Sequence, residues 1–193
     1  MIMIAQSLLL ENAVPEPDPQ VVRAARGGDT GAFESLVRFY QAHVWRLCFH
    51  LLHDETLADD VTQEALVKAF RFLPSYRGES KFSTWLYSIT RNCALDELRK
   101  AGRRHDLLTQ LGREAVPTHR DHSVRIEVRE AIAALPLELR EAVVLIDMFG
   151  TSYSEAAAIL GVPLGTVKSR VHRARLVLAR WLLPASQGST GEA

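Results

Sequence analysis

The sequence lacks the features that would place it in several broad classes. Its two cysteines, Cys48 and Cys93, are too few for a disulfide framework and indicate a reducing compartment. No apolar run approaches the ~20 residues that a membrane-spanning helix needs. The apolar N-terminus has no basic residue before its short run and no small-residue cleavage pattern, so we do not expect a signal peptide. We expect a cytoplasmic protein without direct membrane insertion.

Strict alternation of apolar and polar residues, which a half-buried sheet requires, is also missing. Apolar residues instead recur at helical spacing between widely separated glycines and prolines. With 193 residues, 47% of them hydrophobic, the chain has the size of one globular domain or two small ones. We predict an all-α protein of two small helical domains joined by a flexible linker.

The chain has no net charge, with 23 basic and 23 acidic side chains, but the two signs are segregated. Residues 11–64 carry ten acids and four bases, whereas residues 68–104 carry nine bases and three acids. Residues 105–147 hold eight acids and five bases, and residues 150–183 hold five bases and one acid. Two basic blocks, each following an acidic one, predict two polyanion-binding surfaces and two acidic surfaces free for a protein partner.

The apolar periodicity predicts four helices in a first domain over residues 20–100. The first is expected to end at Gly27, and the second to begin after Asp29 or Thr30 as its cap. The third is expected to run from its cap Asp54 to about Leu73, and the fourth from Phe82 to about Lys100. Residues 1–19, which end in three alternate prolines, are expected to form a flexible arm. Residues 101–123 are polar and contain two glycines and a proline, so they are expected to be the linker.

A second domain is predicted over residues 124–183, followed by a tail at 184–193. Two helices ending at Pro136 and Gly150 precede a short helix that begins with the capping-box spacing of Ser152 and Glu155. Gly161 supplies a left-handed turn before the last helix. That helix has a predicted buried stripe of Val167, Val171, Ala174, Leu178 and Trp181. A short capped helix, a glycine turn and a longer basic helix describe a helix-turn-helix.

Polar and basic residues occupy the side of this last helix away from its apolar stripe. The candidate DNA-binding side chains are Thr166, Lys168, Ser169, Arg170 and Arg173. Arginine bonds phosphates or guanine edges, and serine and threonine reach phosphate oxygens. The alternative is the solvated face of an ordinary helical hairpin. The short helix, the glycine turn and Pro163 together favour DNA recognition.

The first basic block mixes cations with aromatic residues around one predicted helix and its preceding loop. Its cations are Lys81, Arg91, Arg99, Lys100, Arg103 and Arg104. Aromatic rings beside basic side chains suit unstacked bases, because single strands are held by stacking and by backbone charge. The spacing of Trp85 with Phe82 and Ile89 favours a core position for Trp85. Tyr87, Arg91 and Asn92 are the better surface candidates.

Three ordered motifs resemble those of extracytoplasmic-function sigma factors, which are subunits of bacterial RNA polymerase. They are DDVTQEALVKAF (residues 59–70), FSTWLYSITRNCALDELRK (82–100) and YSEAAAILGVPLGTVKSRVHRAR (153–175). The resemblance covers about residues 20–183. It implies two helical domains, sigma regions 2 and 4, joined by a linker and each reading one promoter element. The implied partners are core RNA polymerase, promoter DNA and an anti-sigma factor.

The resemblance also implies a role for individual residues. Asp59, Asp60, Gln63 and Glu64 belong to the helix that docks on core polymerase. The implied minus-ten contacts are Lys81, Tyr87, Arg91, Asn92, Asp96, Arg99 and Lys100, with Asn92 a candidate for holding a flipped base. The predicted face of the last helix is implied to read the minus-thirty-five element in the major groove.

Two rival interpretations stay open on the sequence alone. A stand-alone helix-turn-helix regulator would need only the C-terminal unit, but it would need no strand-melting surface at residues 81–104. A metal-sensing or redox protein could be built on Cys48 and Cys93, and His43, Cys48, His50 and His53 lie close in sequence. We expect no metal and no cofactor, because the sequence dictates no further ligand. No nucleophile with an oriented base is apparent, which argues against an enzyme.

Overall fold

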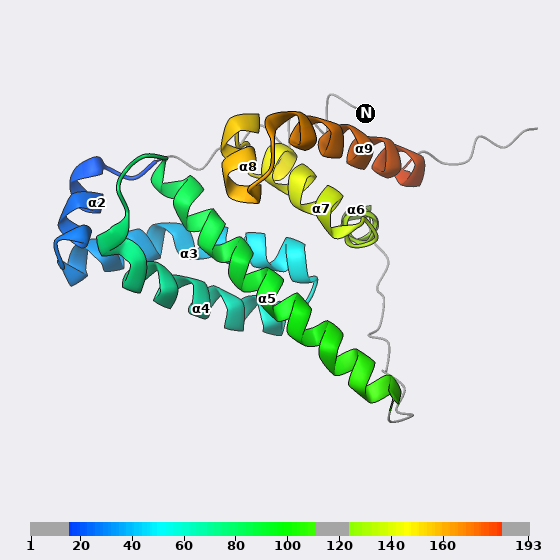
Figure 1. The fold of residues 1–193 in the computed structure, drawn as a ribbon, viewed down its shortest axis with the longest axis horizontal. Helices are drawn as coiled ribbons and strands as arrows, with labels where there is room; N and C mark the ends of the chain where they lie inside the picture. Colours follow the sequence, from blue (N-terminus) through cyan, green and yellow to red (C-terminus); the bar gives the residue numbers. More distant parts are fainter. Residues whose placement is uncertain (1–15, 111–123, 183–193) are drawn as a thin grey trace, which may run out of the picture.

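The computed structural model describes residues 16–110 and 124–182, and all regular structure in these ranges is helical (Figure 1). This confirms the predicted all-α class. No described helix is both long and apolar enough to cross a membrane. Most of the expected arm, the second half of the expected linker and the whole of the expected tail lie outside the described residues.

Residues 19–110 form an N-terminal bundle. Its elements are α2 (Pro19–Arg26), α3 (Thr30–Leu52), α4 (Glu55–Phe72), a short 3-10 turn (Leu73–Ser75) and α5 (Phe82–Gln110). The predicted caps are confirmed, because the Asp29 carboxylate accepts a hydrogen bond from the backbone N–H of Ala32 at 3.0 Å. Asp54 accepts one from Leu57 in the same way at 2.9 Å. Local side-chain chemistry therefore fixes where α3 and α4 begin.

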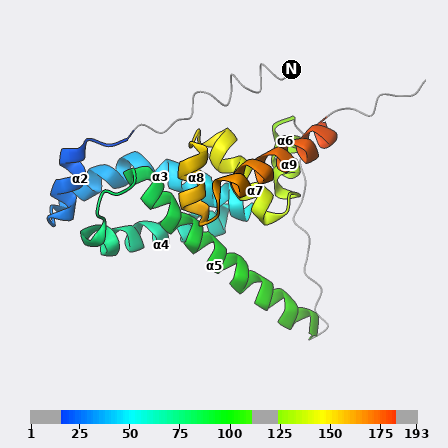
Figure 2. The same ribbon diagram turned by 45° about the horizontal axis from the view of Figure 1, so that its top comes forward.

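Helix α5 corrects the prediction that the fourth helix ends near Lys100, because it continues to Gln110. The first ten residues of the expected linker are thus helical. Gly102 costs only ~1 kcal/mol inside a helix, and no proline follows it before Gln110, so nothing in this stretch ends the helix. Figures 1 and 2 show the last turns of α5 projecting beyond the rest of the bundle.

Residues 124–182 form a C-terminal unit. Its elements are α6 (Val124–Ala133), α7 (Leu137–Val143), a π-helical turn (Val144–Met148), α8 (Tyr153–Leu160) and α9 (Leu164–Leu182). The predicted capping box is present: Ser152 donates its backbone N–H to Glu155 at 2.7 Å, and Glu155 donates its own to Ser152 Oγ at 3.2 Å. Gly161 ends α8 with φ of 65°, which confirms the left-handed turn of the helix-turn-helix.

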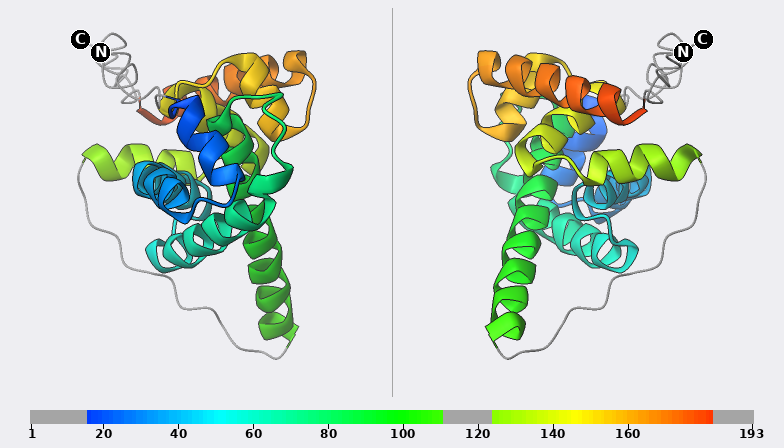
Figure 3. Two further views of the ribbon diagram at one scale, coloured as in Figure 1. Left: turned by 90° about the vertical axis from the view of Figure 1, so that its left-hand side faces the viewer. Right: turned by 90° about the vertical axis from the view of Figure 1, so that its right-hand side faces the viewer.

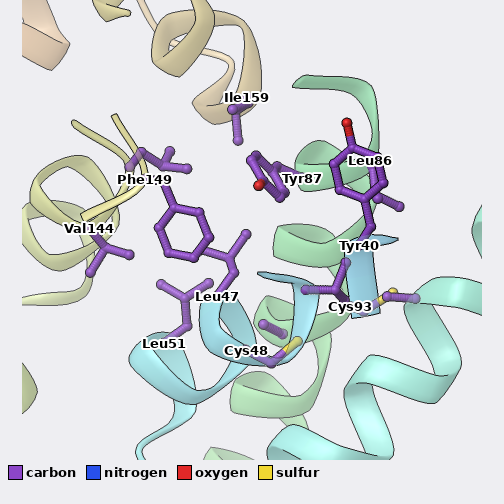
Figure 4. Packing of buried hydrophobic residues seen from close by; sticks show 14 of the residues in the cluster. Tyr40, Leu47, Cys48, Leu51, Leu86, Tyr87, Cys93, Val144, Phe149 and Ile159 are labelled. Carbon is purple, nitrogen blue, oxygen red and sulfur yellow. The ribbon is translucent and has the colours of Figure 1, made fainter. Parts of the chain in front are cut away.

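The N-terminal bundle and the C-terminal unit share one hydrophobic core. Figures 1 and 3 show the C-terminal unit lying across α3 and α5. Phe149 and Val144 point toward Leu47 and Leu51 of α3 in Figure 4, and all four side chains are at least 98% buried. The sequence predicts the two units but not this contact between them.

The helical period of residues 57–72 predicts that Phe72 points inward, as it does for Trp181 in the last helix, but both aromatic side chains are exposed. Trp181, near the end of α9, is 60% exposed, and Phe72, at the end of α4, is 53% exposed. Both lie in the last turn of their helix. The apolar stripe of α9 is buried at Val167, Val171 and Ala174.

Replacing Gly161 by alanine should destabilise the protein by ~1–2 kcal/mol, because an L side chain is strained at its left-handed backbone angles. Its Cβ would meet nothing within 4 Å, so the cost is purely conformational. Gly165→Ala is the matched control, since Gly165 lies in α9 with equally open surroundings. It should leave stability unchanged or raise it by up to ~1 kcal/mol. Equal urea midpoints for the two variants would contradict this account.

Candidate nucleic-acid and polymerase interfaces

Helix α9 carries the predicted DNA-reading residues on the side away from the core. Val167, Val171 and Ala174 are buried, whereas Lys168, Ser169 and Arg173 are exposed and Thr166 and Arg170 are half-buried. Four of the five predicted residues are three or four positions apart along the helix and therefore share one face. They are Thr166, Ser169, Arg170 and Arg173. The predicted basic face is therefore present and open to solvent.

The neighbouring Arg175 has a structural role. Its Nε donates to Asp147 Oδ2 at 2.9 Å, and its Nη2 contacts the other carboxylate oxygen, so the pair is bidentate. Asp147 belongs to the π-helical turn before α8. This pair ties α9 to the element that precedes the helix-turn-helix.

Helix α4 brings the four predicted polymerase-docking residues onto one side. Asp60 and Gln63 are exposed, and the half-buried Glu64 forms an ion pair with Lys68 at 2.7 Å. Asp59 has a structural partner, because its Oδ1 accepts a hydrogen bond from Trp45 Nε1 of α3 at 2.7 Å. The free carboxylate on this side is therefore that of Asp60.

Helix α5 exposes part of the predicted minus-ten surface. Asn92, Arg99 and Lys100 are exposed, and Asp96 is half-buried. Asp96 pairs with Arg99 at 3.0 Å, and Glu97 pairs with Lys100 at 3.2 Å, both one turn apart along the helix. In both pairs the cation is exposed to solvent, which weakens its attraction to the carboxylate, so Arg99 and Lys100 remain available to an anionic ligand.

The prediction that Tyr87 lies on the surface is wrong. Tyr87 is 1% exposed, because Phe149 of the C-terminal unit packs edge-on against its ring with the centroids 5.4 Å apart. Burial raises the pKa of its hydroxyl, and Tyr87 Oη has no hydrogen-bond partner. The side chain faces outward from the N-terminal bundle, as predicted, but the C-terminal unit covers it (Figure 4).

Two further minus-ten candidates are held by carboxylates of the C-terminal unit. Arg91 forms a bidentate ion pair with Glu141 of α7, with Nε–Oε1 and Nη2–Oε2 distances of 2.7 and 3.1 Å. Lys81 Nζ lies 2.6 Å from Glu155 Oε1 at the start of α8. Burial raises the pKa of the Glu155 carboxyl, but hydrogen bonds from Lys81 and from Ser152 outweigh it and hold that pKa below its usual range.

Glu141, Phe149 and Glu16 are interface residues that the sequence does not assign. Glu16 accepts a hydrogen bond from the backbone N–H of Phe82 at 3.0 Å and thus caps α5. The sequence does carry a signal for Glu141, which falls four residues after Leu137 and four before Leu145 and so lies on an apolar helix face. An acid at such a position indicates a buried cationic partner, but the sequence does not identify it.

The histidines considered for metal binding lie where α3 meets the C-terminal unit. Among the described residues, no three histidine, cysteine or acidic side chains come together as a metal site. Burial first, and the nearby cations Arg46 and Arg140 second, lower the pKa values of His50 and His53 to about 4. Both imidazoles are therefore neutral at pH 7. His50 Nδ1 and His53 Nε2 are buried without hydrogen-bond partners.

Comparisons with known proteins match both units. The family model described as Sigma-70 region 2 matches residues 36–104, and the model of Sigma-70, region 4 matches residues 125–178. The chain is 37% identical to the RNA polymerase sigma-H factor of Pseudomonas aeruginosa, covering 88% of this chain and 95% of that one. It is 35% identical to the ECF RNA polymerase sigma-E factor of Haemophilus influenzae, covering 86% and 96%.

Two solved structures resemble the fold. The sigma factor RpoE in complex with the anti-sigma factor NepR from Bartonella quintana has a TM-score of 0.68 at 31% identity, over 78% of this chain and 96% of that one. CnrH in complex with the cytosolic domain of CnrY has a TM-score of 0.66 at 28% identity, over 86% and 96%. Both similarities extend across the N-terminal bundle and the C-terminal unit.

The two buried histidines predict a loss of stability on acidification. Because their folded-state pKa values lie below the ordinary value, the unfolded chain binds more protons between about pH 6.5 and 4, so the unfolding free energy falls as pH falls through that window. His50 alone should contribute roughly 1 kcal/mol per pH unit there, and the more accessible His53 less. Urea unfolding at pH 7, 6 and 5 measures the slope.

His50→Leu should flatten this pH dependence, whatever it does to stability at pH 7. His172→Gln, on the exposed side of α9, is the control and should leave the slope unchanged. If the parent and His50→Leu lose stability equally between pH 7 and 5, then His50 is not the titrating group.

Proposed function

This chain belongs to the sigma-70 family of RNA polymerase sigma factors, in its extracytoplasmic-function group, and we propose which of its surfaces serve each step of transcription initiation. As a sigma factor it binds core RNA polymerase, directs the polymerase to specific promoters and promotes strand opening. The observation that carries the surface assignment is the pairing of an open basic face on α9 with a second basic face on α5 of the same chain. Both of these faces can bind nucleic acid.

The face of α9 is assigned to the minus-thirty-five element. A basic helix whose opposite stripe is buried fits the major groove, where arginine can make bidentate contacts to guanine. Arg170 and Arg173 are the candidates for base or phosphate contacts, and Thr166, Lys168 and Ser169 for the phosphates beside them. The alternative of a stand-alone helix-turn-helix regulator leaves the α5 surface without a role.

The face of α5 is assigned to the minus-ten strand. Asn92 is exposed and can hold a flipped base, and Lys81, Arg91, Arg99 and Lys100 can follow the phosphates. Asp96 shares this face and orients Arg99. Tyr87 can stack on a base only when the C-terminal unit does not cover it.

The acidic side of α4 is assigned to core polymerase, through Asp60, Gln63 and Glu64, with Asp59 fixing Trp45 behind them. We propose that the chain catalyses no reaction of its own and works with the polymerase in the cytoplasm without a metal or cofactor. The two structural relatives are complexes with an anti-sigma factor and with the cytosolic domain of CnrY, which supports an anti-sigma partner for this chain as well.

Reversing the charge of Asp60 should weaken docking on core polymerase. Asp60→Arg places a cation where we assign a basic partner surface, and a loss of roughly tenfold in affinity, or ~1.4 kcal/mol, is expected. Glu34→Arg on α3 is the matched control, since Glu34 is also exposed and makes only a pair with Arg38 one turn away. Fluorescence titration of labelled core polymerase measures both. If Asp60→Arg binds core polymerase with the same affinity as the parent, the docking assignment is wrong.

Removing the Arg170 side chain should weaken minus-thirty-five recognition by ~1–3 kcal/mol and relax the preference at one base pair if the contact is bidentate to guanine. A phosphate contact would instead weaken all promoters alike and reduce the salt slope by about one unit. Arg180→Ala, in the last turn of the same helix, removes the same charge and serves as the control.

Run-off transcription from a minus-thirty-five-dependent promoter, over a library of single-base variants, is the measurement for Arg170. Core polymerase binding and helix content should stay at the parental level, because Arg170 lies outside the hydrophobic core. The recognition-helix assignment fails if Arg170→Ala and Arg173→Ala, separately and together, transcribe as the parent does.

A further inference from the structure

The proposed function leaves unassigned a cavity between helix α2 and the loop that precedes α5. Its volume is about 340 Å³, which lies within the range of small-molecule sites. Val22, Arg23 and Arg26 line it from α2, and Tyr76 and Phe82 line it from the loop and the start of α5. Figure 1 shows both elements at the same end of the N-terminal bundle. The cavity is therefore bounded by two separate segments of the chain.

The apolar floor of this cavity is formed by Val22, Tyr76 and Phe82, which are all less than 10% exposed. Ring contacts hold it in place, because the Tyr76 and Phe82 centroids are 5.8 Å apart and both rings also contact Trp85. The Tyr76 hydroxyl donates to the Ser80 carbonyl at 2.6 Å, so its polar atom is already satisfied within the loop. A ligand on this floor meets ordered apolar surface.

Two charged residues at the edge of the cavity have partners on other elements. Glu16, the one acid among the described lining residues, accepts a hydrogen bond from the backbone N–H of Phe82 at 3.0 Å. Its other carboxylate oxygen accepts one from the Ser83 hydroxyl. Lys81 is paired with Glu155 of α8. The carboxylate of Glu16 is therefore committed to the start of α5, and the ammonium of Lys81 to α8.

Arg23 and Arg26 form the charged end of the cavity. Both side chains are exposed, and they lie three positions apart on α2, so they share one side of the helix. Within residues 16–110 and 124–182, no acidic side chain forms an ion pair with either arginine. Burial and Glu16 raise the pKa of the Tyr76 hydroxyl, whereas Arg26 lowers it, which agrees with a guanidinium close to the apolar floor.

We propose that this cavity binds a small anionic amphiphile of the medium-chain carboxylate class. Its alkyl chain lies on the apolar floor, and its carboxylate accepts hydrogen bonds from Arg23 and Arg26. A guanidinium matches the two oxygens of a carboxylate, and each methylene that leaves water adds affinity. A nucleobase fits less well, because its polar edge would lose hydrogen bonds to water without gaining partners on this floor.

This inference goes beyond the proposed function and does not depend on it, since it needs neither promoter DNA nor polymerase. The test is a titration of the full chain with decanoate, at concentrations below those at which decanoate forms micelles. Calorimetry measures the affinity, and nitrogen–proton correlation NMR reports which backbone amides respond. We expect one site, with shifts at Val22, Gly78 and Phe82 around the cavity and none at Asp60 on α4 or at Arg170 on α9.

A series of carboxylates separates the apolar part of the site from the charged part. Between hexanoate and decanoate the affinity should rise by roughly fourfold for each additional methylene that is buried. Acetate carries the charge without the chain and should shift no amide at the same concentrations. Decanol carries the chain without the charge and should bind more weakly than decanoate.

Arg26→Gln removes one cation from the charged end at an exposed position, so the fold should be retained. We expect its affinity for decanoate to fall roughly tenfold and its affinity for decanol to stay at the parental level. Arg23→Gln should act in the same direction. Arg71→Gln is the matched control, since Arg71 is also exposed and also lies in the last turn of its helix, α4, but is not among the described lining residues. It should bind decanoate as the parent does.

Three results would overturn the inference. In the first, decanoate shifts no amide around the cavity of the full chain. In the second, Arg26→Gln and Arg71→Gln weaken decanoate binding equally, which would indicate a general attraction of anions to basic surface.

The third result concerns a short single-stranded oligonucleotide of mixed sequence, added as a competing probe. If it shifts the same amides and displaces decanoate, the cavity belongs to a strand-binding surface and takes no amphiphile of its own. Decanoate binding that increases with chain length, requires Arg26 and persists in the presence of the oligonucleotide supports the inference.

Discussion

The ion pair between Arg91 and Glu141 is the contact on which the arrangement of the two halves depends. An arginine on α5 and an acid on the apolar side of α7 are each costly to bury alone, and each becomes tolerable only beside the other. Once they meet, α7 is fixed against α5, and Phe149 reaches the gap between Leu47 and Tyr87. Phe149 then belongs to one core with residues of both halves.

A buried ion pair of this kind contributes more to the specificity of the docking between the two halves than to its stability. Replacing both partners by apolar residues is often neutral, whereas removing one leaves a buried charge and is strongly destabilising. The pair therefore acts as a register device: it disfavours other dockings of the C-terminal unit, in which Arg91 or Glu141 would be buried unpaired. The unsatisfied hydroxyl of Tyr87 and the unsatisfied histidines beside it show that the fit is specific without being optimal.

Features that depend on neighbours in sequence could be predicted, and features that depend on distant partners could not. The caps at Asp29, Asp54 and Ser152 and the left-handed turn at Gly161 are set within one helical turn, so the sequence predicts them correctly. The exposed residues of α9 follow from the same period. The burial of Tyr87 depends on Phe149, 62 residues away, and no periodicity along α5 contains that information.

The α4 side that carries Asp60 and Gln63 lies apart from the ion pair that joins the two halves. Both residues are exposed while Arg91 and Glu141 are paired. A ligand shifts a conformational equilibrium only by its difference in affinity for the two states. A partner that touched only these residues of α4 would therefore leave the contact between the N-terminal bundle and the C-terminal unit unchanged.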